Sequence, residues 1–390
     1  MNRMGWGLLL VLAITPAWGL RKTTVGELKD ELATMHKEGR NDADVADALK
    51  QVELSEELTR SMMNSMVADV PGPLSTEQIY VLEARSAMLA PPTTDIPTTA
   101  SPDATGQKTI LDKVADYVSK IYSQLPALTA TRTTLRFQDN IRAAPASSGM
   151  HSGAVDISTG AGFSNGFQYI RYINSVNAQV ASEQGAERLP SEKDKTPWGA
   201  NGMIALLDPV PSLTAVFVEA QAAGDIKWLR WELINGKAAA VFSFDVPKKK
   251  ARMPIDVCCF PDVEQAGMVR SSTAPINPLA SGGTPKGNFQ TNTSYHPYKA
   301  NVPYHGEFFI DPDSGVVVRM ITQAELKPTE VVHQEDTRID YGPVEIGGKP
   351  LVTPVKTVID TEVVPYGDSG AAGAYTTRTT FFISEYKDYK

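Results

Sequence analysis

The sequence predicts an α+β protein: a large antiparallel sheet packed on a helix and preceded by a small helical segment. Three observations predict this class. Apolar residues recur at helical spacing over residues 23–89, residues 103–124 form one amphipathic helix, and most of the chain after residue 130 alternates in the period of strands. Short turns join consecutive strand patterns, which indicates a meander and therefore an antiparallel sheet.

The first 19 residues are typical of a cleavable signal peptide. Arg3 precedes an apolar run at 8–14, and Ala17 and Gly19 place small residues where a signal peptidase acts. The apolar run is shorter than the about 20 residues that a membrane-spanning helix needs. We therefore expect a periplasmic or secreted protein that does not span the membrane; an uncleaved N-terminal anchor is the alternative.

The helical segment covers residues 20–89. Thr24 and Glu27 form a capping box that begins a first helix, and Ser75 with Gln78 forms another. Asp42 is expected to cap a second helix with a continuous apolar stripe. The members of that stripe are Val45, Ala46, Leu49, Val52, Leu54, Leu58, Met62 and Met66.

A Pro/Thr-rich linker at 90–102 separates this segment from the β domain at 103–390. A short helix is expected at 209–223. Asn235-Gly236 joins two strand patterns, and the turn at 311–315 joins two more. The expected strands are 130–137, 226–234, 237–246, 255–260, 304–310, 316–323, 331–341, 351–364 and 375–386. Segments near 138–165 and 261–303 are rich in Gly, Ser and Pro, and are expected to be loop insertions.

The hairpin at 304–320, Tyr-His-Gly-Glu-Phe-Phe-Ile-Asp-Pro-Asp-Ser-Gly-Val-Val-Val-Arg-Met, resembles a signature of the periplasmic lipoprotein-carrier superfamily. That superfamily includes the outer-membrane lipoprotein-sorting proteins. The chain also resembles a group of uncharacterised secreted bacterial proteins, through the stretches 125–134 and 341–349. The resemblance covers roughly residues 103–390. It implies a curved antiparallel sheet (half-barrel) wrapped on a helix, which holds acyl chains on its concave side.

Composition and motifs exclude several classes of function. With 37 Lys and Arg against 45 Asp and Glu, the chain is acidic and has one short basic cluster, which is less than the clustered basic surface that nucleic-acid binding requires. The basic cluster at 248–252 fits a solvated hairpin tip or a contact with anionic lipid. Cys258 and Cys259 are adjacent, which gives neither a disulfide framework nor zinc-ligand spacing. Free thiols and a vicinal or intermolecular bridge both remain open.

Two His-x-Glu pairs have the spacing of metal ligands on one strand face, His305 with Glu307 and His333 with Glu335. An intervening strand at 316–323 should keep the pairs about 9–10 Å apart, too far to share one ion. The sequence contains no Gly-x-Ser-x-Gly motif and no group placed for acid–base work. We therefore expect no enzyme, no metal and no cofactor.

Two hypotheses of function follow. In the first, the concave sheet face binds a lipid, an acyl chain or another apolar ligand. Its lining would be Leu229, Trp231, Phe242, Phe244, Phe308, Val316, Val318 and Met320. In the second, the protein is an envelope interaction or scaffold protein with a filled interior, and the helical segment docks a protein partner. A cavity of about 300 Å³ or more behind the sheet would favour the first hypothesis.

Overall fold

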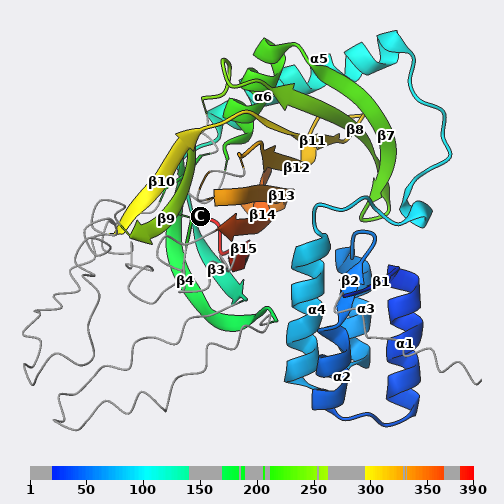
Figure 1. Cartoon of the computed structure of the whole chain (residues 1–390). Coiled ribbons are helices and arrows are strands. Elements are labelled where there is room, and N and C mark those ends of the chain that lie inside the picture. Colours follow the sequence, from blue (N-terminus) through cyan, green and yellow to red (C-terminus); the bar gives the residue numbers. More distant parts are fainter. Residues whose placement is uncertain are drawn as a thin grey trace, which may run out of the picture.

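The computed structural model describes residues 20–139, 169–183, 186–188, 205–206, 211–252, 254–261, 295–327, 330, 332–363 and 378–390. These residues form an N-terminal helical module, a large sheet with two helices on it, and a small sheet (Figure 1). The expected signal peptide at 1–19 and nearly all of the expected loop insertion at 138–165 lie outside the described residues.

The helical module consists of four helices and a two-stranded parallel sheet. Its core contains Leu28, Leu49, Leu58 and Met66, each at most 2% exposed. The capping box of Thr24 and Glu27 is formed as the sequence predicts. The elements are β1 (Arg21–Thr23), α1 (Val25–Lys37), α2 (Asp42–Leu49), β2 (Val52–Leu54), α3 (Arg60–Asp69) and α4 (Pro73–Ser86).

Two details of the module differ from the prediction. Val52 and Leu54 lie in β2, which pairs with β1, so the predicted apolar stripe is not one helix face. Asn41 caps α2, while the carboxylate of Asp42 accepts hydrogen bonds from the backbone N–H groups of Leu74 and Ser75 at 2.9 and 2.8 Å. Asp42 therefore caps α4 instead of its own helix, and a contact between helices replaces the predicted capping box at Ser75.

The large sheet is antiparallel throughout. Within the described residues it has ten strands in the order β5-β4-β3-β15-β14-β13-β12-β11-β8-β7. It is curved and has two open edges, at β5 and β7, so it does not close into a barrel (Figure 1). Its strands are β3 (Leu128–Gln138), β4 (Arg171–Glu183), β5 (Ala186–Arg188), β7 (Ile226–Ile234), β8 (Lys237–Val246), β11 (Tyr304–Ile310), β12 (Val317–Ala324), β13 (Val332–Ile346), β14 (Lys349–Val363) and β15 (Arg378–Lys387).

The predicted hairpins form. Asn235 and Gly236 join β7 to β8 with φ values of 51° and 78°, a left-handed turn that Asn and Gly adopt most readily. The turn between β11 and β12 contains Gly315 at φ 75°, where a side chain would collide with Lys113. The predicted fold class, a curved antiparallel sheet with helices on it and a helical segment before it, is confirmed.

The small sheet has the order β10-β9-β6, from β6 (Ala205–Leu206), β9 (Pro254–Pro261) and β10 (Tyr295–Asn301). Strand β10 lies within the range expected to be a loop, 261–303, and that part of the prediction is wrong because β10 pairs with β9 over most of its length. Residues 262–294 lie outside the described residues. Cys258 and Cys259 belong to β9. Their side chains lie outside the described part of the structure, so the free-thiol and disulfide interpretations stay predictions.

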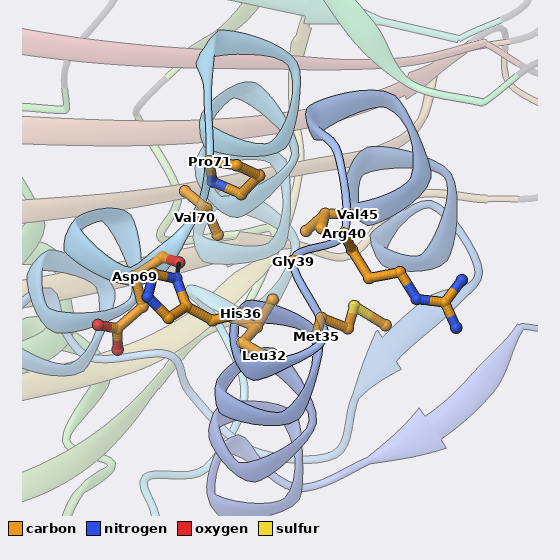
Figure 2. Close-up of a pocket in the computed structure, with 9 residues that line it drawn as sticks. All are labelled: Leu32, Met35, His36, Gly39, Arg40, Val45, Asp69, Val70 and Pro71. Atoms are coloured by element: carbon orange, nitrogen blue, oxygen red, sulfur yellow. Dashed lines mark hydrogen bonds between the residues drawn. The ribbon is translucent and has the colours of Figure 1, made fainter.

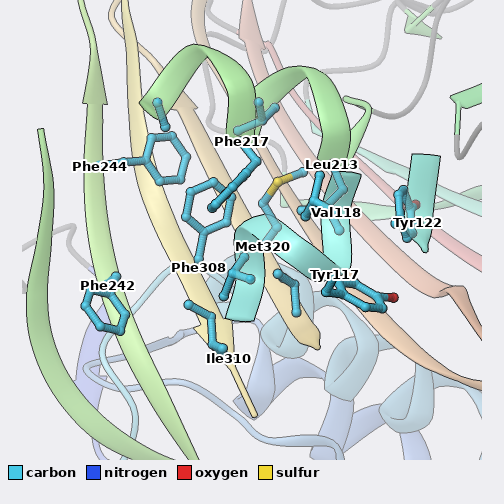
Figure 3. Packing of buried hydrophobic residues seen from close by; sticks show 14 of the residues in the cluster. Tyr117, Val118, Tyr122, Leu213, Phe217, Phe242, Phe244, Phe308, Ile310 and Met320 are labelled. Carbon is cyan, nitrogen blue, oxygen red and sulfur yellow. The ribbon is translucent and has the colours of Figure 1, made fainter. Parts of the chain in front are cut away.

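The two faces of the large sheet have different covers. On one, hereafter the helix-covered face, α5 (Ala104–Lys120) and α6 (Leu213–Ala223) bury the main apolar core (Figure 3). On the other, the module-covered face, α4 packs through Val81 and Ala84 against residues of β3, β14 and β15. Two short 3₁₀ segments, η1 (Thr93–Asp95) and η2 (Tyr122–Gln124), flank α5.

Candidate functional site

The expected apolar ligand site is occupied by the protein's own helices. Phe242, Phe244, Phe308 and Met320 lie together on the helix-covered face and are at most 2% exposed. Phe308 stacks on Phe244 at a ring-centroid distance of 4.4 Å, and Phe217 of α6 meets Phe308 edge-on at 5.5 Å (Figure 3). Helix side chains therefore fill the place that an acyl chain would take beside these rings.

Two of the predicted lining residues are displaced by β-bulges. Leu229 is the extra residue between Trp228 and Arg230 in the pairing of β7 with β8, and it is 44% exposed. Val318 is the extra residue in the pairing of β12 with β11, and it packs with a cluster on the module-covered face. A bulge shifts the alternation of side chains by one residue, so a strict period of two misplaces both.

Trp231 and Val316 lie at the margin of the same apolar core, partly buried. The ring of Trp231 meets that of Trp228 at 5.0 Å, and its indole nitrogen donates a hydrogen bond to the carbonyl oxygen of Ala100 at 2.9 Å. The predicted set thus has six members on the helix-covered core, one exposed residue and one residue on the opposite face.

The two His-x-Glu pairs do not come together. Strand β12 lies between β11 and β13, as the sequence predicts. His305 approaches Glu325 at 3.6 Å, whereas Glu307 binds Arg230. In the part of the chain that the structure describes, no group of three His, Cys, Asp or Glu side chains could hold a metal ion.

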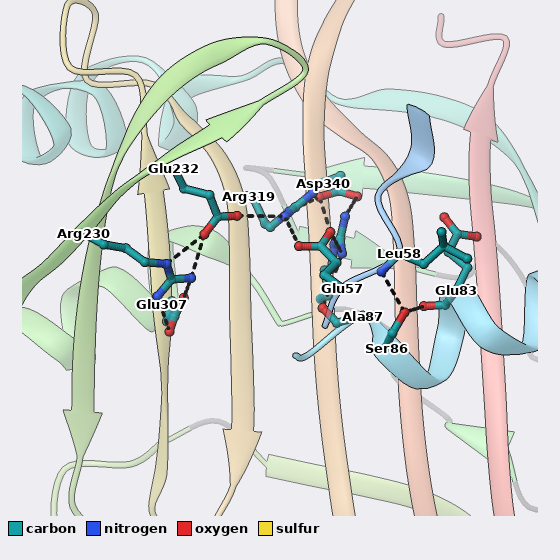
Figure 4. Close-up of polar contacts among 11 residues, drawn as sticks. Glu57, Leu58, Glu83, Ser86, Ala87, Arg230, Glu232, Glu307, Arg319 and Asp340 are labelled. Carbon is teal, nitrogen blue, oxygen red and sulfur yellow. Dashed lines mark hydrogen bonds and ion pairs between the residues drawn. The ribbon is translucent and has the colours of Figure 1, made fainter. Parts of the chain in front are cut away.

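A buried ion-pair cluster connects the module to the sheet (Figure 4). Glu57, just after β2, places one carboxylate oxygen 2.6 Å from Arg338 and the other 3.2 Å from Arg319. Asp340 on β13 accepts from the same two guanidinium groups at 3.1 and 2.7 Å. Glu57, Arg319 and Arg338 are each at most 7% exposed, so water screens these pairs weakly.

The cluster continues along the sheet towards β7. Arg230 binds Glu232 at 2.7 Å and Glu307 at 2.8 Å, and Glu232 lies 3.6 Å from Arg319. Burial raises the pKa of Glu232, although Arg230 opposes that rise. For Asp340, burial acts in the same direction, but Arg319 and Arg338 together hold its pKa well below the ordinary value of 3.8.

The last turns of α4 add one more contact between module and sheet and one contact within the module. Glu83 forms a buried ion pair with Lys356 of β14. Ser86 accepts a hydrogen bond from the backbone N–H of Leu58 at 3.0 Å, which ties α4 to the segment carrying Glu57 (Figure 4). The C-terminal end of α4 is therefore fixed on the sheet by polar contacts of defined geometry.

A small apolar pocket opens at the other end of the module (Figure 2). It has a volume of about 180 Å³ and lies between the end of α1, the start of α2 and the connection from α3 to α4. His36 lies at its rim, with Nδ1 3.1 Å from the carbonyl oxygen of Asp69. The lining residues are Leu32, Met35, His36, Gly39, Arg40, Val45, Asp69, Val70 and Pro71.

Sequence patterns gave only a partial signal for the cluster and none for the pocket. Arg319, Arg230 and Glu232 stand out as charged residues inside otherwise apolar strand patterns, which indicates a covered polar face. Glu57 gives no such signal, because it lies in a short connection and its partner Arg338 follows 281 residues later.

No family model, curated protein or solved structure matches this chain. The resemblance to the lipoprotein-carrier superfamily therefore stays a prediction. Among the described residues, no helix has both the length and the apolar character that crossing a membrane requires.

Proposed function

We propose that this chain is an exported, non-catalytic interaction protein in which the large sheet carries a helical module that binds a protein partner. The observation that carries the proposal is the packing of Phe242, Phe244, Phe308 and Met320 against α5 and α6. A filled interior favours an interaction protein over a carrier of apolar ligands. Export rests on the signal-peptide pattern of residues 1–19.

The geometry of the module supports a docking role. One end of α4 is fixed by the pairs of Glu83 and Glu57 with the sheet, and the pocket lies near the helix's other end, about 20 Å away for 14 residues. Leu74, in the first turn of α4, is 51% exposed. The module thus presents an apolar surface away from the sheet.

The size of the pocket limits its occupant. Its volume of about 180 Å³ is below the about 300–1,000 Å³ of pockets that enclose a whole small-molecule ligand. It suits one large apolar side chain inserted by a protein partner.

Site-specific photo-crosslinking in the producing bacterium tests this proposal. A photoreactive amino acid at Met35, inside the pocket, should give a covalent adduct of one defined mass. The same amino acid at Lys29, exposed on the same helix, should not. Val70→Phe, which narrows the pocket, should abolish the adduct at Met35. Equal labelling at both positions, or labelling that survives V70F, contradicts docking in the pocket.

Native mass spectrometry of the protein, purified from an envelope fraction without detergent, tests the apolar-ligand alternative. The bare mass of the chain from Leu20 to Lys390 agrees with cleavage after Gly19 and with a filled interior. Extra mass that leaves on gentle activation, and that extraction identifies as lipid, would replace the interaction proposal with ligand carriage.

A further inference from the structure

Two aspartates lie side by side on the module-covered face. Asp336 on β13 is directly opposite Asp360 on β14, so both carboxyl groups point to the same face of the sheet. Two residues further along β13, Arg338 binds Glu57 of the module, which identifies that face. The side-chain amide of Gln334 donates to Asp336 at 2.8 Å and to Asp360 at 3.1 Å. One amide group therefore bridges the two carboxyl groups.

The pair is shielded from water and has few partners. Asp336 is 6% exposed, and Oδ1 of Asp360 is buried without a hydrogen-bond partner among the described residues. Gln323 on β12 gives Asp336 a second hydrogen bond at 3.1 Å. In the described part of the chain, the side-chain donors to the pair are thus neutral amides. Two ionised carboxylates at this place would be buried without a compensating ion pair, which is costly.

Charged groups on the surrounding elements act on the pair in both directions. Burial raises the pKa of both aspartates, and the charge of Asp336 helps to raise that of Asp360 well above its ordinary value of 3.8. Arg85 opposes the rise at Asp360 and His305 opposes it at Asp336, but neither cancels it. The charged groups around the pair are Glu335 and Arg338 of β13, Glu362 of β14, Asp139 after β3, Arg85 of α4 and His305 of β11.

From this geometry we infer that Asp336 and Asp360 share one proton and act as a pH switch between the sheet and the helical module. Two like charges on opposed residues, out of water, cost more than one carboxyl group that stays neutral beside its ionised neighbour. A proton needs no cavity, so close packing around the pair does not oppose its binding. When rising pH releases this proton to solvent, two carboxylates repel each other across the ladder between β13 and β14.

The pair lies next to the contacts that fix the module. Val358, two residues before Asp360 on β14, packs in one apolar cluster with α4. Directly opposite Val358 on β13 is Arg338, which holds the module through Glu57. Repulsion within the pair therefore acts beside both kinds of contact, and rising pH should loosen the module before the sheet unfolds. The inference is independent of the docking role proposed for the pocket, because the pocket lies at the other end of the module.

Carbon-13 NMR of the carboxyl groups, in the chain from Leu20 to Lys390 with labelled aspartate, tests the shared proton. Asp336→Asn and Asp360→Asn assign the two signals. One of the two should titrate at least about one pH unit above 3.8, and each substitution should lower the midpoint of the remaining partner. The inference is overturned if both signals titrate at or below 3.8, or if neither midpoint responds to substitution of its partner.

Amide hydrogen exchange tests the link to the module, with the unmodified chain and D360N compared at the same pH. Helix α4 should exchange alike in both chains at pH 5, and at least about threefold faster in the unmodified chain at pH 8.5. The β7–β8 hairpin should exchange alike at both pH values. Glu345→Gln, at an exposed position of β13, is the control and should follow the unmodified chain. D336N replaces D360N if that variant does not fold. A ratio in α4 that stays the same at both pH values would overturn the switch.

Discussion

On one face of the large sheet α5 and α6 are held by apolar and aromatic contacts, whereas on the other face buried ion pairs join the apolar contacts of α4 in holding the helical module. Phe217 of α6 meets Phe308 on the first face, and Glu57 of the module binds Arg319 and Arg338 on the second. Apolar contacts are non-directional and depend on area, while charge-assisted hydrogen bonds need defined distances and angles.

We infer from this difference that one face of the sheet mainly provides stability and the other mainly fixes the orientation of the helical module. The helix-covered face buries large apolar side chains and should provide most of the free energy of folding. A buried ion pair contributes little net stability, because desolvation offsets the attraction, but removing one partner is expensive. We therefore expect the Glu57 cluster to fix where the module sits on the sheet, and the aromatic core to decide whether the sheet folds.

The largest effect should come from Phe308→Ala on the helix-covered face. Removing a fully buried ring leaves a cavity and should lower the free energy of unfolding by about 3–5 kcal/mol in urea denaturation. Val218→Ala on the exposed side of α6 is the control and should change it by less than about 0.5 kcal/mol. A loss below about 1.5 kcal/mol for F308A would mean that this face is not the main core.

The pH dependence of stability should have opposite signs at Glu335 and at Asp340, which lie on opposite faces. On the helix-covered face Glu335 has a folded pKa of about 7, above its ordinary 4.5, so its contribution is complete below pH 4.5 and is lost as pH rises through 7. Relative to the unmodified chain, Glu335→Gln should become more stable by about 3 kcal/mol between pH 4 and pH 8.

On the module-covered face Asp340 has a lowered pKa, so its contribution is present above pH 3.8 and is lost as pH falls below that value. The stability difference between the unmodified chain and Asp340→Asn should therefore shrink on acidification. Urea denaturation at several pH values measures both variants. Parallel pH profiles for E335Q and D340N would remove the distinction between these two sites.

A somewhat smaller loss should follow Glu57→Gln. The substitution leaves Arg319 and Arg338 buried without one of their carboxylates, and Asp340 compensates in part, so we expect a loss of about 2–3 kcal/mol. Glu53→Gln, which removes an exposed pair with Lys22, should cost less than about 0.5 kcal/mol. Relative to the unmodified chain, amide hydrogen exchange in E57Q should accelerate more in the helical module than in the β11–β12 hairpin. An equal acceleration in both regions would argue against an orienting role of Glu57.

The smallest effect should come from replacing both members of a buried pair. Glu83→Leu with Lys356→Met exchanges the ion pair for apolar contact and should stay within about 1 kcal/mol of the unmodified chain, or stabilise it. Lys356→Met alone should cost more than the double variant, because it leaves Glu83 buried without its cation. Thermal unfolding of the two variants measures this order of stability. A double variant that is less stable than Lys356→Met alone would contradict the prediction.

Local chemistry made much of the fold predictable. The Asn-Gly turn predicts the bounds of β7 and β8 as the structure has them, and the capping box of Thr24 predicts the start of α1. Strand β4 was not predicted. Its alternation of Val176, Ala178 and Val180 with polar residues is short, and most of its residues are exposed or half-buried.

The sites could be predicted only in part, since they depend on partners far apart in the chain. The bulges at Leu229 and Val318 are invisible to a period-two pattern, and the pairing of Glu57 with Arg338 depends on how the module docks.

The position of β15 has a consequence for the order of folding. This strand, at the C-terminal end of the sequence given, lies between β14 and β3, and the backbone of Lys390 pairs with that of Thr129. Without β15, the strands β3–β5 and the strands β7–β14 of the large sheet have no ladder between them. A chain made from its N-terminus thus holds two unfinished sheets with open edges until β15 has been made, and such edges recruit other chains. Assembly of the sheet is therefore a late step that depends on long-range contacts. Such steps slow folding and leave the chain open to chaperone binding and to aggregation.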